Sequence, residues 1–244
     1  ENSVMRTDLT SSMMKILKGN YNRRNSSAAL FEIGRIFTPT EGEILPRETQ
    51  NIAIGMYGDY DFYSLKGVVE QMLERVGIYD FEFEPCIDNP TYHAGRCATV
   101  YAGGKYLGIL GQINPSVCAN FKIDAEVYAA MLDFEVIAEQ FATDRHYKAL
   151  PKFPAVSRDI AVTVDKTVPV GDIVKVIKAQ KSGIIEDYKL FDVYEGEQLG
   201  EGKKSVAYSI TFRAADRTLT DDDVNPVTNK ILEELEQKLG AQLR

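Results

Sequence analysis

One aromatic residue with polar neighbours in the second half of the sequence could contact a nucleic-acid base. Tyr194 closes a predicted strand, Asp192 lies two positions earlier on the same side of that strand, and Ser205 begins the next strand. A tyrosine ring can carry a stacked base, while a carboxylate or hydroxyl can hydrogen-bond to the base edge. From these residues alone, a tyrosine that covers a sheet edge and an aspartate that caps a turn are the simpler interpretation.

Four basic residues in the same half are candidate phosphate contacts: Arg158, Lys203, Lys204 and Arg213. Each of them could equally be an ordinary solvated charge. The net charge of -8 does not favour nucleic acid, because affinity for phosphates comes from Lys and Arg. Residues 151–244 are less acidic than the rest, with 14 basic and 16 acidic side chains against 14 and 20 in residues 1–150.

The first half offers weaker candidates for catalysis. His93 and Arg96 could act as a base and an anion holder, but no nucleophile or paired carboxylate stands beside them, so a structural loop or subunit contact is preferred. The segment FEIGR at 31–35 could hold a phosphate, although a strand with outward Glu and Arg is simpler. The glycines at 103, 104, 108 and 111 suit a hairpin, and no arginine follows before Arg145, so we expect no ATP site.

Metal and disulfide chemistry is not expected. Cys86, Cys97 and Cys118 form no CxxC pair, and the sequence has only two histidines. This odd number and wide spacing predict buried free thiols and no metal site. No run approaches the roughly 18 to 20 apolar residues that span a bilayer, and no signal pattern opens the chain, so we expect a cytoplasmic protein.

The pattern of the first half predicts an α+β unit on an antiparallel sheet. Apolar residues at helical spacing predict helices over 8–20 and 62–76, and a short helix is expected from Pro115. Strands are expected at 28–37, 51–57, 79–83, 97–101, 106–113 and 126–134. Hairpins that alternate with a few helices are typical of an antiparallel sheet.

A polar stretch at 143–148 followed by Pro151 and Pro154 indicates a domain boundary. We expect one domain over residues 1–148 and a second over 151–244. The second is predicted to run strand 159–164, helix 170–179, strand 184–194, strand 205–212, helix 222–239 and strand 241–244. This β-α-β-β-α-β order is ferredoxin-like, and the fold alone decides nothing about function.

Five short motifs give the second half a resemblance to a known family: KFPAVSRDIA at 152–161, LFDVYEG at 190–196, GKKSVA at 202–207, RTLTD at 217–221 and GAQLR at 240–244. They resemble the ferredoxin-fold anticodon-binding domain that ends bacterial-type phenylalanyl-tRNA synthetase beta chains. The first half resembles the catalytic-like class II synthetase module that precedes that domain, through MRTDL at 5–9, LFEIGRIF at 30–37, DFYSLKG at 61–67 with Glu70, and HAGR at 93–96. Ala94 and Asn114 depart from the family, which usually has Pro and His there.

The resemblance implies a heterotetramer of two alpha and two beta chains, in which alpha activates phenylalanine with ATP and charges tRNA(Phe). The whole enzyme would use ATP and magnesium, whereas these residues would hold no cofactor and be catalytically silent alone. They would bind tRNA(Phe) and organise the alpha subunit and second beta chain, with Asp192, Tyr194 and Ser205 on the anticodon-facing surface. The sequence opens without Met, so we expect a piece of a longer chain whose editing domain precedes Glu1.

Two other interpretations stay open. An autonomous class II enzyme with an altered ATP site would show ATP-pyrophosphate exchange with phenylalanine. A regulatory module that uses its ferredoxin-like domain for a small ligand would have a closed apolar pocket and no tRNA-dependent signal.

Overall fold

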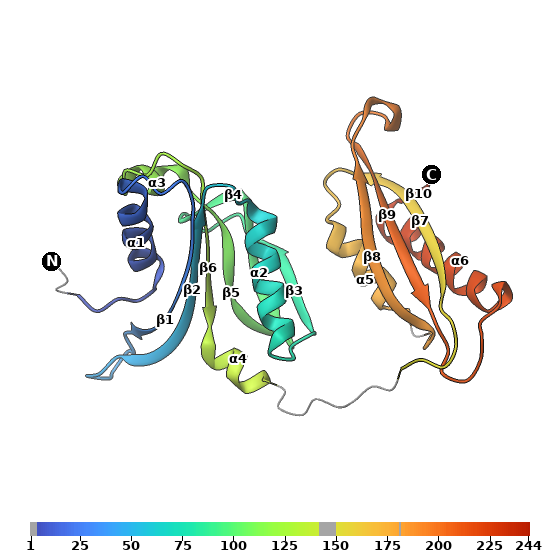
Figure 1. The fold of residues 1–244 in the computed structure, drawn as a ribbon, viewed down its shortest axis with the longest axis horizontal. Helices are drawn as coiled ribbons and strands as arrows, with labels where there is room; N and C mark the ends of the chain where they lie inside the picture. Colours follow the sequence, from blue (N-terminus) through green and yellow to red (C-terminus); the bar gives the residue numbers. More distant parts are fainter. Residues whose placement is uncertain (1–3, 142–149, 181) are drawn as a thin grey trace. The chain divides into compact units, whose positions relative to one another are not determined.

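The computed structural model describes residues 4–141, 150–180 and 182–244, and the chain divides into two compact units, residues 1–146 and 147–244. Each unit is built on its own antiparallel sheet with helices packed on it (Figure 1), which confirms the expected α+β class. Among the described helices, none is both long and apolar enough to cross a membrane. The polar stretch expected to join the units, residues 143–148, lies outside the described residues.

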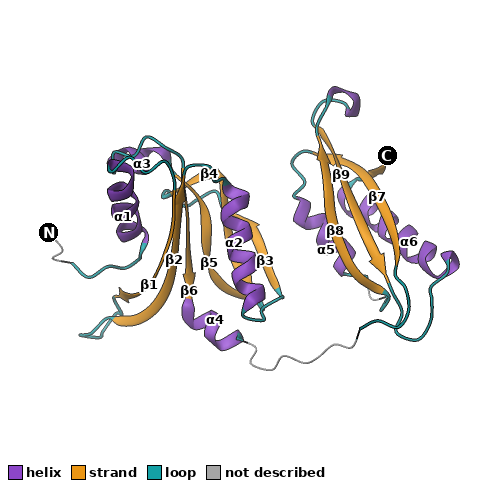
Figure 2. Ribbon diagram, viewed as in Figure 1, coloured by secondary structure: helices purple, strands orange, loops and turns teal. Residues whose placement is uncertain are grey.

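The first unit contains a six-stranded sheet in the order β1-β2-β6-β5-β4-β3 (Figure 2). Its strands are β1 (Ala28–Thr38), β2 (Arg47–Tyr57), β3 (Phe81–Pro85), β4 (Tyr92–Ala102), β5 (Lys105–Ile113) and β6 (Val127–Asp133). Its helices are α1 (Thr10–Asn22), α2 (Phe62–Arg75), α3 (Pro115–Asn120) and α4 (Phe134–Gln140). Every neighbouring pair of strands is antiparallel, as the hairpin pattern predicts.

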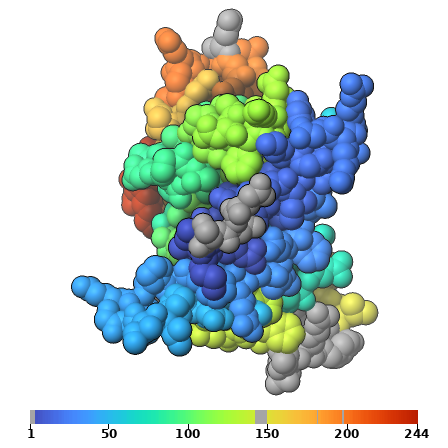
Figure 3. All heavy atoms as spheres, turned by 90° about the vertical axis from the view of Figure 1, so that its left-hand side faces the viewer, coloured from blue at the N-terminus to red at the C-terminus, as the bar shows by residue number. Residues whose placement is uncertain are grey.

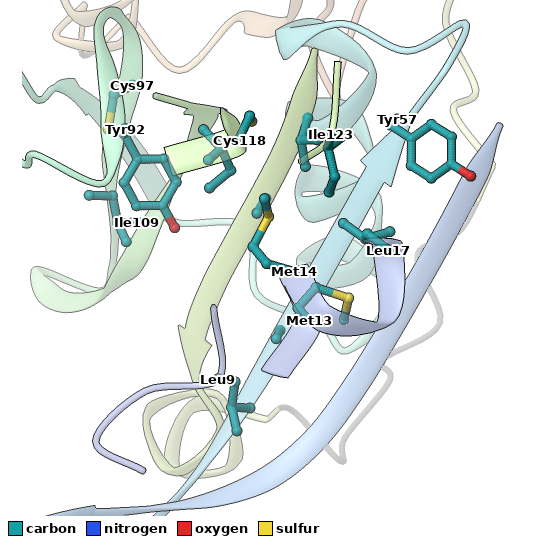
Figure 4. Packing of buried hydrophobic residues seen from close by; sticks show 14 of the residues in the cluster. Leu9, Met13, Met14, Leu17, Tyr57, Tyr92, Cys97, Ile109, Cys118 and Ile123 are labelled. Atoms are coloured by element: carbon teal, nitrogen blue, oxygen red, sulfur yellow. The ribbon is translucent and has the colours of Figure 1, made fainter. Parts of the chain in front are cut away.

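Helix α1 closes one face of this sheet. Met13 and Leu17 lie on one side of α1 and pack in a cluster with Tyr57 and other alternate strand residues (Figure 4). The helix approaches β2 at Gly55, where an added Cβ would lie 2.5 Å from Met13 Cγ. The glycine therefore permits the close contact between helix and strand.

Helix α2 closes the opposite face. Leu65, Val69 and Leu73 recur at helical spacing, are fully buried, and pack on the other set of alternate strand residues. The helix begins at Asp61, whose carboxylate accepts a hydrogen bond from Ser64 N at 2.7 Å. Hydrogen bonds from Ser64 lower the pKa of Asp61, as expected for an ionised cap.

The outer strand β1 is less covered than the rest of the sheet. Its side chains alternate, and Phe31 and Ile33 are 73% and 51% exposed. The connection from β1 to β2, residues 39–46, projects from the side of the unit that Figure 3 shows. This edge therefore presents apolar side chains at the surface.

The second unit has the order β-α-β-β-α-β, and its ferredoxin-like arrangement is confirmed. The elements are β7 (Val156–Asp165), α5 (Val170–Lys178), β8 (Ile185–Tyr194), the short 3-10 helix η1 (Glu197–Leu199), β9 (Lys203–Phe212), α6 (Asp221–Leu239) and β10 (Gln242–Leu243). The sheet order is β10-β7-β9-β8 with all pairs antiparallel.

Both helices of this unit lie on the same face of its sheet (Figure 1). Alternate residues such as Ile160, Val162 and Ile210 point to that side and form one core with Ile173 of α5 and Ile231 of α6. Among the described residues of the second unit, α5 and α6 belong to the core on this side, and no helix joins a core on the other side. The two-residue period of the strands thus divides the unit into a buried face and an open face.

Several element bounds differ from the sequence-based expectation, and two of the differences have a clear structural reason. The strand expected to reach residue 134 ends at Asp133, where α4 begins. The Asp133 carboxylate caps that helix by accepting hydrogen bonds from Glu135 N at 2.8 Å and Val136 N at 3.3 Å. Strand β4 begins at Tyr92, earlier than expected, because Tyr92 pairs with Ile113 before the register shifts to Cys97.

The three cysteines are free thiols, as expected. Cys97 and Cys118 are buried, whereas Cys86 is only half-buried. Burial raises the pKa of Cys97 to about 12, so this thiol is protonated near neutral pH.

A pair of glycine substitutions tests the packing of the first unit. An added Cβ at Gly108 would collide with the backbone carbonyl oxygen of Met131 on the neighbouring strand. Because backbone cannot rotate away, Gly108→Ala is expected to lower the free energy of unfolding by roughly 1–3 kcal/mol. At Gly67, inside α2, an added Cβ would meet nothing within 4 Å. Gly67→Ala should instead raise the free energy of unfolding by about 0.5–1 kcal/mol, and urea denaturation of both variants makes the comparison.

We propose that the two units fold separately, since each has its own sheet and core. Limited trypsin digestion should then cut first near Arg145 or Lys148, because cleavage between separately folded domains is faster than cleavage within them. Mass spectrometry of the early fragments gives the positions. Early cleavage within α5, at Lys175 or Lys178, would contradict separate folding.

Candidate nucleic-acid interface

The open face of the second sheet carries mostly small side chains on its central strand β9. It carries every second residue of each strand, and on the central strand β9 these are Lys203, Ser205, Ala207, Ser209 and Thr211. Ser205 pairs with Thr163 of β7 on one side and with Tyr194 of β8 on the other. Ser205 and Ala207 are only 3% and 6% exposed, because larger neighbouring side chains lie over these small ones.

A β-bulge in β8 turns two of the predicted site residues onto this face. The register with β9 shifts between Leu190 and Asp192, which leaves Phe191 as the extra residue. Beyond the bulge Asp192 pairs with Ala207 and Tyr194 with Ser205, both open-face positions. Without the extra residue the alternation would have carried Asp192 to the helix side. The structure therefore brings Asp192, Tyr194 and Ser205 together on one surface.

The ring of Tyr194 is partly covered by two neighbours. Its exposed fraction is 38%. The phenol lies against Gly196, where an added Cβ would collide with the Tyr194 hydroxyl. The guanidinium carbon of Arg244 lies 5.5 Å from the ring centroid. A base could therefore stack only on the part of the ring that these groups leave free.

Ser205 is the predicted site residue that lies least accessible. It is 3% exposed, and its Oγ accepts a long hydrogen bond of 3.5 Å from Arg244 Nη1. Direct contact between Ser205 and a phosphate or base, as expected from the sequence, thus requires Arg244 to move. Asp192, by contrast, is exposed.

The two adjacent lysines have different surroundings. Lys204 is 9% exposed, and its Nζ donates to the carbonyl oxygen of Lys166 at 3.1 Å, so its ammonium is engaged inside the protein. Lys203 points to the open face opposite Asp165, and no ion pair involves it among the described residues. Of the two, Lys203 is the one placed to meet a phosphate.

The two arginines predicted as phosphate contacts lie at the other end of the sheet. Arg213 follows the end of β9, eight residues from Ser205, or about 26 Å along the strand direction. Arg213 Nε pairs with Glu186 at 2.8 Å, and Arg158 pairs with Asp221 at the start of α6. Both guanidinium groups already have carboxylate partners far from Tyr194, so the structure does not bring them into this site.

In the first unit, His93 and Arg96 form no catalytic arrangement. Arg96 Nη1 donates to Gln112 Oε1 at 2.8 Å and to Glu126 Oε1 at 3.2 Å, while Tyr128 donates to Glu126 Oε2 at 2.6 Å. Burial raises the pKa of Tyr128 to about 12, and the hydrogen bond from Tyr128 lowers the pKa of Glu126. Arg96 thus belongs to a polar network on the sheet, whereas His93 only accepts from Gly95 N at 3.1 Å.

The FEIGR segment is part of β1, and its charges are paired within the unit. Glu32 Oε1 lies 2.8 Å from Arg6 Nη1, and Arg35 Nη1 lies 3.0 Å from Glu48 Oε2. Across the described residues, no group of three or more His, Cys, Asp or Glu side chains could hold a metal. The charged side chains of the FEIGR segment are thus engaged in ion pairs within the first unit.

Sequence reasoning missed Arg244 as a member of the interface. Its backbone N donates to Ala161 O at 3.0 Å, which continues the pairing of β10 with β7 and directs its side chain to the open face. The predicted strand over 241–244 carried this signal, since alternation places Gln242 and Arg244 on the same side. Its contact with Tyr194 could not be foreseen, because it joins two outer strands across the sheet.

Comparison with known proteins matches two families along the chain. The family described as "Phenylalanyl tRNA synthetase beta chain CLM domain" matches residues 1–134. The family described as "Ferredoxin-fold anticodon binding domain" matches residues 151–244. Together these matches cover the first sheet with α1, α2 and α3, and the whole ferredoxin-like fold.

Curated relatives match over almost the whole chain. The phenylalanine-tRNA ligase beta subunits of Clostridium tetani and Clostridium acetobutylicum are 46% and 45% identical over 243 residues, which is 99% of this chain. The chain spans 31% of the length of each of these relatives.

Among solved structures, a pyrrolysyl-tRNA synthetase from Desulfitobacterium hafniense has 15% sequence identity and a TM-score of 0.47. The similarity covers 55% of this chain and 49% of that chain. The family models and the curated relatives agree with each other over both units. The chain belongs to the family of phenylalanyl-tRNA synthetase beta chains.

Proposed function

We propose that this chain is the tRNA-binding and subunit-organising part of a phenylalanine-tRNA ligase, and that its ferredoxin-like unit binds the anticodon of tRNA(Phe). The observation that carries the proposal is the pairing of β8 with β9, which collects Tyr194, Asp192 and Ser205 at one end of the sheet face opposite to α5 and α6. An aromatic ring beside exposed polar groups suits single-stranded loop bases, whose faces and edges are both accessible.

Each residue of this surface has a distinct role in the proposal. The Tyr194 ring carries one anticodon base, and the exposed Asp192 carboxylate accepts hydrogen bonds from the edge of that base. Lys203 meets a phosphate, because it shares the face and the end of the sheet with Tyr194 and has no carboxylate within ion-pair distance among the described residues. Arg158, Arg213 and Lys204 have structural roles instead, through Asp221, Glu186 and the Lys166 carbonyl.

The first unit is proposed to organise subunits rather than to perform chemistry. Its arginines that could hold an ATP phosphate, Arg35 and Arg96, are paired with Glu48 and Glu126. ATP and magnesium would act on the alpha chain, within a cytoplasmic heterotetramer of two alpha and two beta chains. The exposed apolar edge at Phe31 and Ile33 is available for a subunit contact.

The anticodon proposal is tested by substituting Tyr194. Tyr194→Ala should weaken binding of tRNA(Phe) by about 1–3 kcal/mol, because a base–aromatic stack is lost. The difference should vanish for a tRNA(Phe) whose anticodon nucleotides are abasic, because no base is left to stack on the ring. Fluorescence anisotropy of labelled RNA measures both affinities, and circular dichroism checks the fold.

Matched controls separate this effect from general surface changes. Tyr79→Ala removes a tyrosine that is 72% exposed in the first unit and should leave affinity unchanged. Lys203→Ala should reduce the salt dependence of binding, whereas Lys238→Ala, on α6 and paired with Glu234 at 2.6 Å, should not. If wild type and Tyr194→Ala bind both RNAs alike, the tyrosine does not read the anticodon.

The chain is also expected to be catalytically silent alone. Incubation with ATP, phenylalanine and tRNA(Phe) should give neither ATP-pyrophosphate exchange nor charged tRNA, because Arg35 and Arg96 are engaged in ion pairs within the unit. Charging without an alpha chain would disprove this assignment and favour an autonomous enzyme.

A further inference from the structure

The side chain of Arg244 lies across the open face of the second unit and contacts both Tyr194 and Ser205. Arg244 lies next to β10 at one side of the sheet, whereas Tyr194 lies on β8 at the other side. The two strands are three steps apart, or about 14 Å. Their side chains nevertheless meet, with the guanidinium carbon 5.5 Å from the ring centroid, directly above Ser205.

The Arg244 guanidinium has no strong partner in this position. Its contact with Ser205 Oγ is 3.5 Å long, and no carboxylate pairs with it among the described residues. The remaining contact is cation–π attraction at an exposed site, which is weak. Arg244 can therefore leave these two weak contacts when a stronger partner, such as an anion, is present.

The other neighbour of the ring cannot leave as easily. The backbone of Gly196 lies against the Tyr194 phenol, and Gly196 belongs to the connection between β8 and β9. Arg244 presses on the ring with a flexible side chain. Of the two groups that cover the ring, only Arg244 can leave without rearranging the chain.

We propose that Arg244 is a movable cover of the anticodon surface, which leaves the Tyr194 ring and the Ser205 hydroxyl when a base stacks and then pairs with a backbone phosphate of the RNA. This inference rests on the proposed function. When Arg244 leaves, the hydrogen bond to Ser205 Oγ is released and that hydroxyl becomes free to bond to the RNA. The movement also makes Arg244 a specificity-determining residue, because only RNA that can stack on the ring displaces it.

The salt dependence of binding tests the phosphate contact. Affinities of wild type, Arg244→Ala and Arg244→Lys for tRNA(Phe) are measured between about 50 and 200 mM salt. Arg244→Ala should reduce the slope of log K against log salt by about 0.7–0.9, the value for one phosphate. Arg244→Lys keeps the charge and should retain the wild-type slope, and Lys238→Ala is the control for a cation on the covered side. An unchanged slope in Arg244→Ala would overturn the proposal.

A spectroscopic measurement follows the movement itself. In the free protein the Tyr194 ring should shift the Arg244 Nε–H resonance upfield, and Tyr194→Ala should abolish that shift. Saturating tRNA(Phe) should abolish it in the wild type as well. If the shift persists in the complex, Arg244 has stayed on the ring and the proposal is wrong. Failure of the wild type to bind tRNA(Phe) at all would instead reject the proposed function, which keeps the two outcomes distinct.

Discussion

Antiparallel pairing of β9 with both β7 and β8 is the constraint on which the second unit depends. Because strand side chains alternate, one register sends Val206 and Tyr208 to the helices and Ser205 and Ala207 to the open face. A slip of one residue would exchange these sets, leaving Val206 in solvent and Ser205 in the core. The stability of the core and the composition of the proposed RNA surface are thus set by the same backbone hydrogen bonds.

The motifs that carry the family resemblance are mostly explained by folding. In RTLTD, Leu219 is buried, Thr220 donates from N and Oγ1 to Asp223 Oδ2 at 2.9 Å, and Arg217 pairs with Asp223 at 2.8 Å. The backbone hydrogen bond from Thr220 is the largest of the effects that lower the pKa of Asp223 to about 2, so this start of α6 stays charged. The LFDVYEG motif differs, since its bulge directs two side chains outward.

Local sequence patterns predicted the helices and strands, whereas the surroundings of the candidate site residues depend on contacts between residues far apart in the sequence. Alternation along 184–194 and 205–212 was sufficient to place Tyr194 and Ser205 in strands, and helical spacing located α2, α5 and α6. The hydrogen bond from Arg244 to Ser205 joins residues 39 apart, and the pairing of Arg158 with Asp221 joins residues 63 apart. The bulge at Phe191 has no local signal, because it follows from fitting β8 to β9.

The charge of the open face indicates what this unit can contribute to RNA binding. By register and alternation it carries four aspartates and three cations, namely Asp159, Asp165, Asp187, Asp192, Lys189, Lys203 and Arg244. A surface of this composition attracts a polyanion weakly, because non-specific affinity comes from an excess of Lys and Arg. Hydrogen bonds from a base edge to Asp192 depend instead on which base is present. We infer that this unit contributes discrimination between anticodons more than affinity.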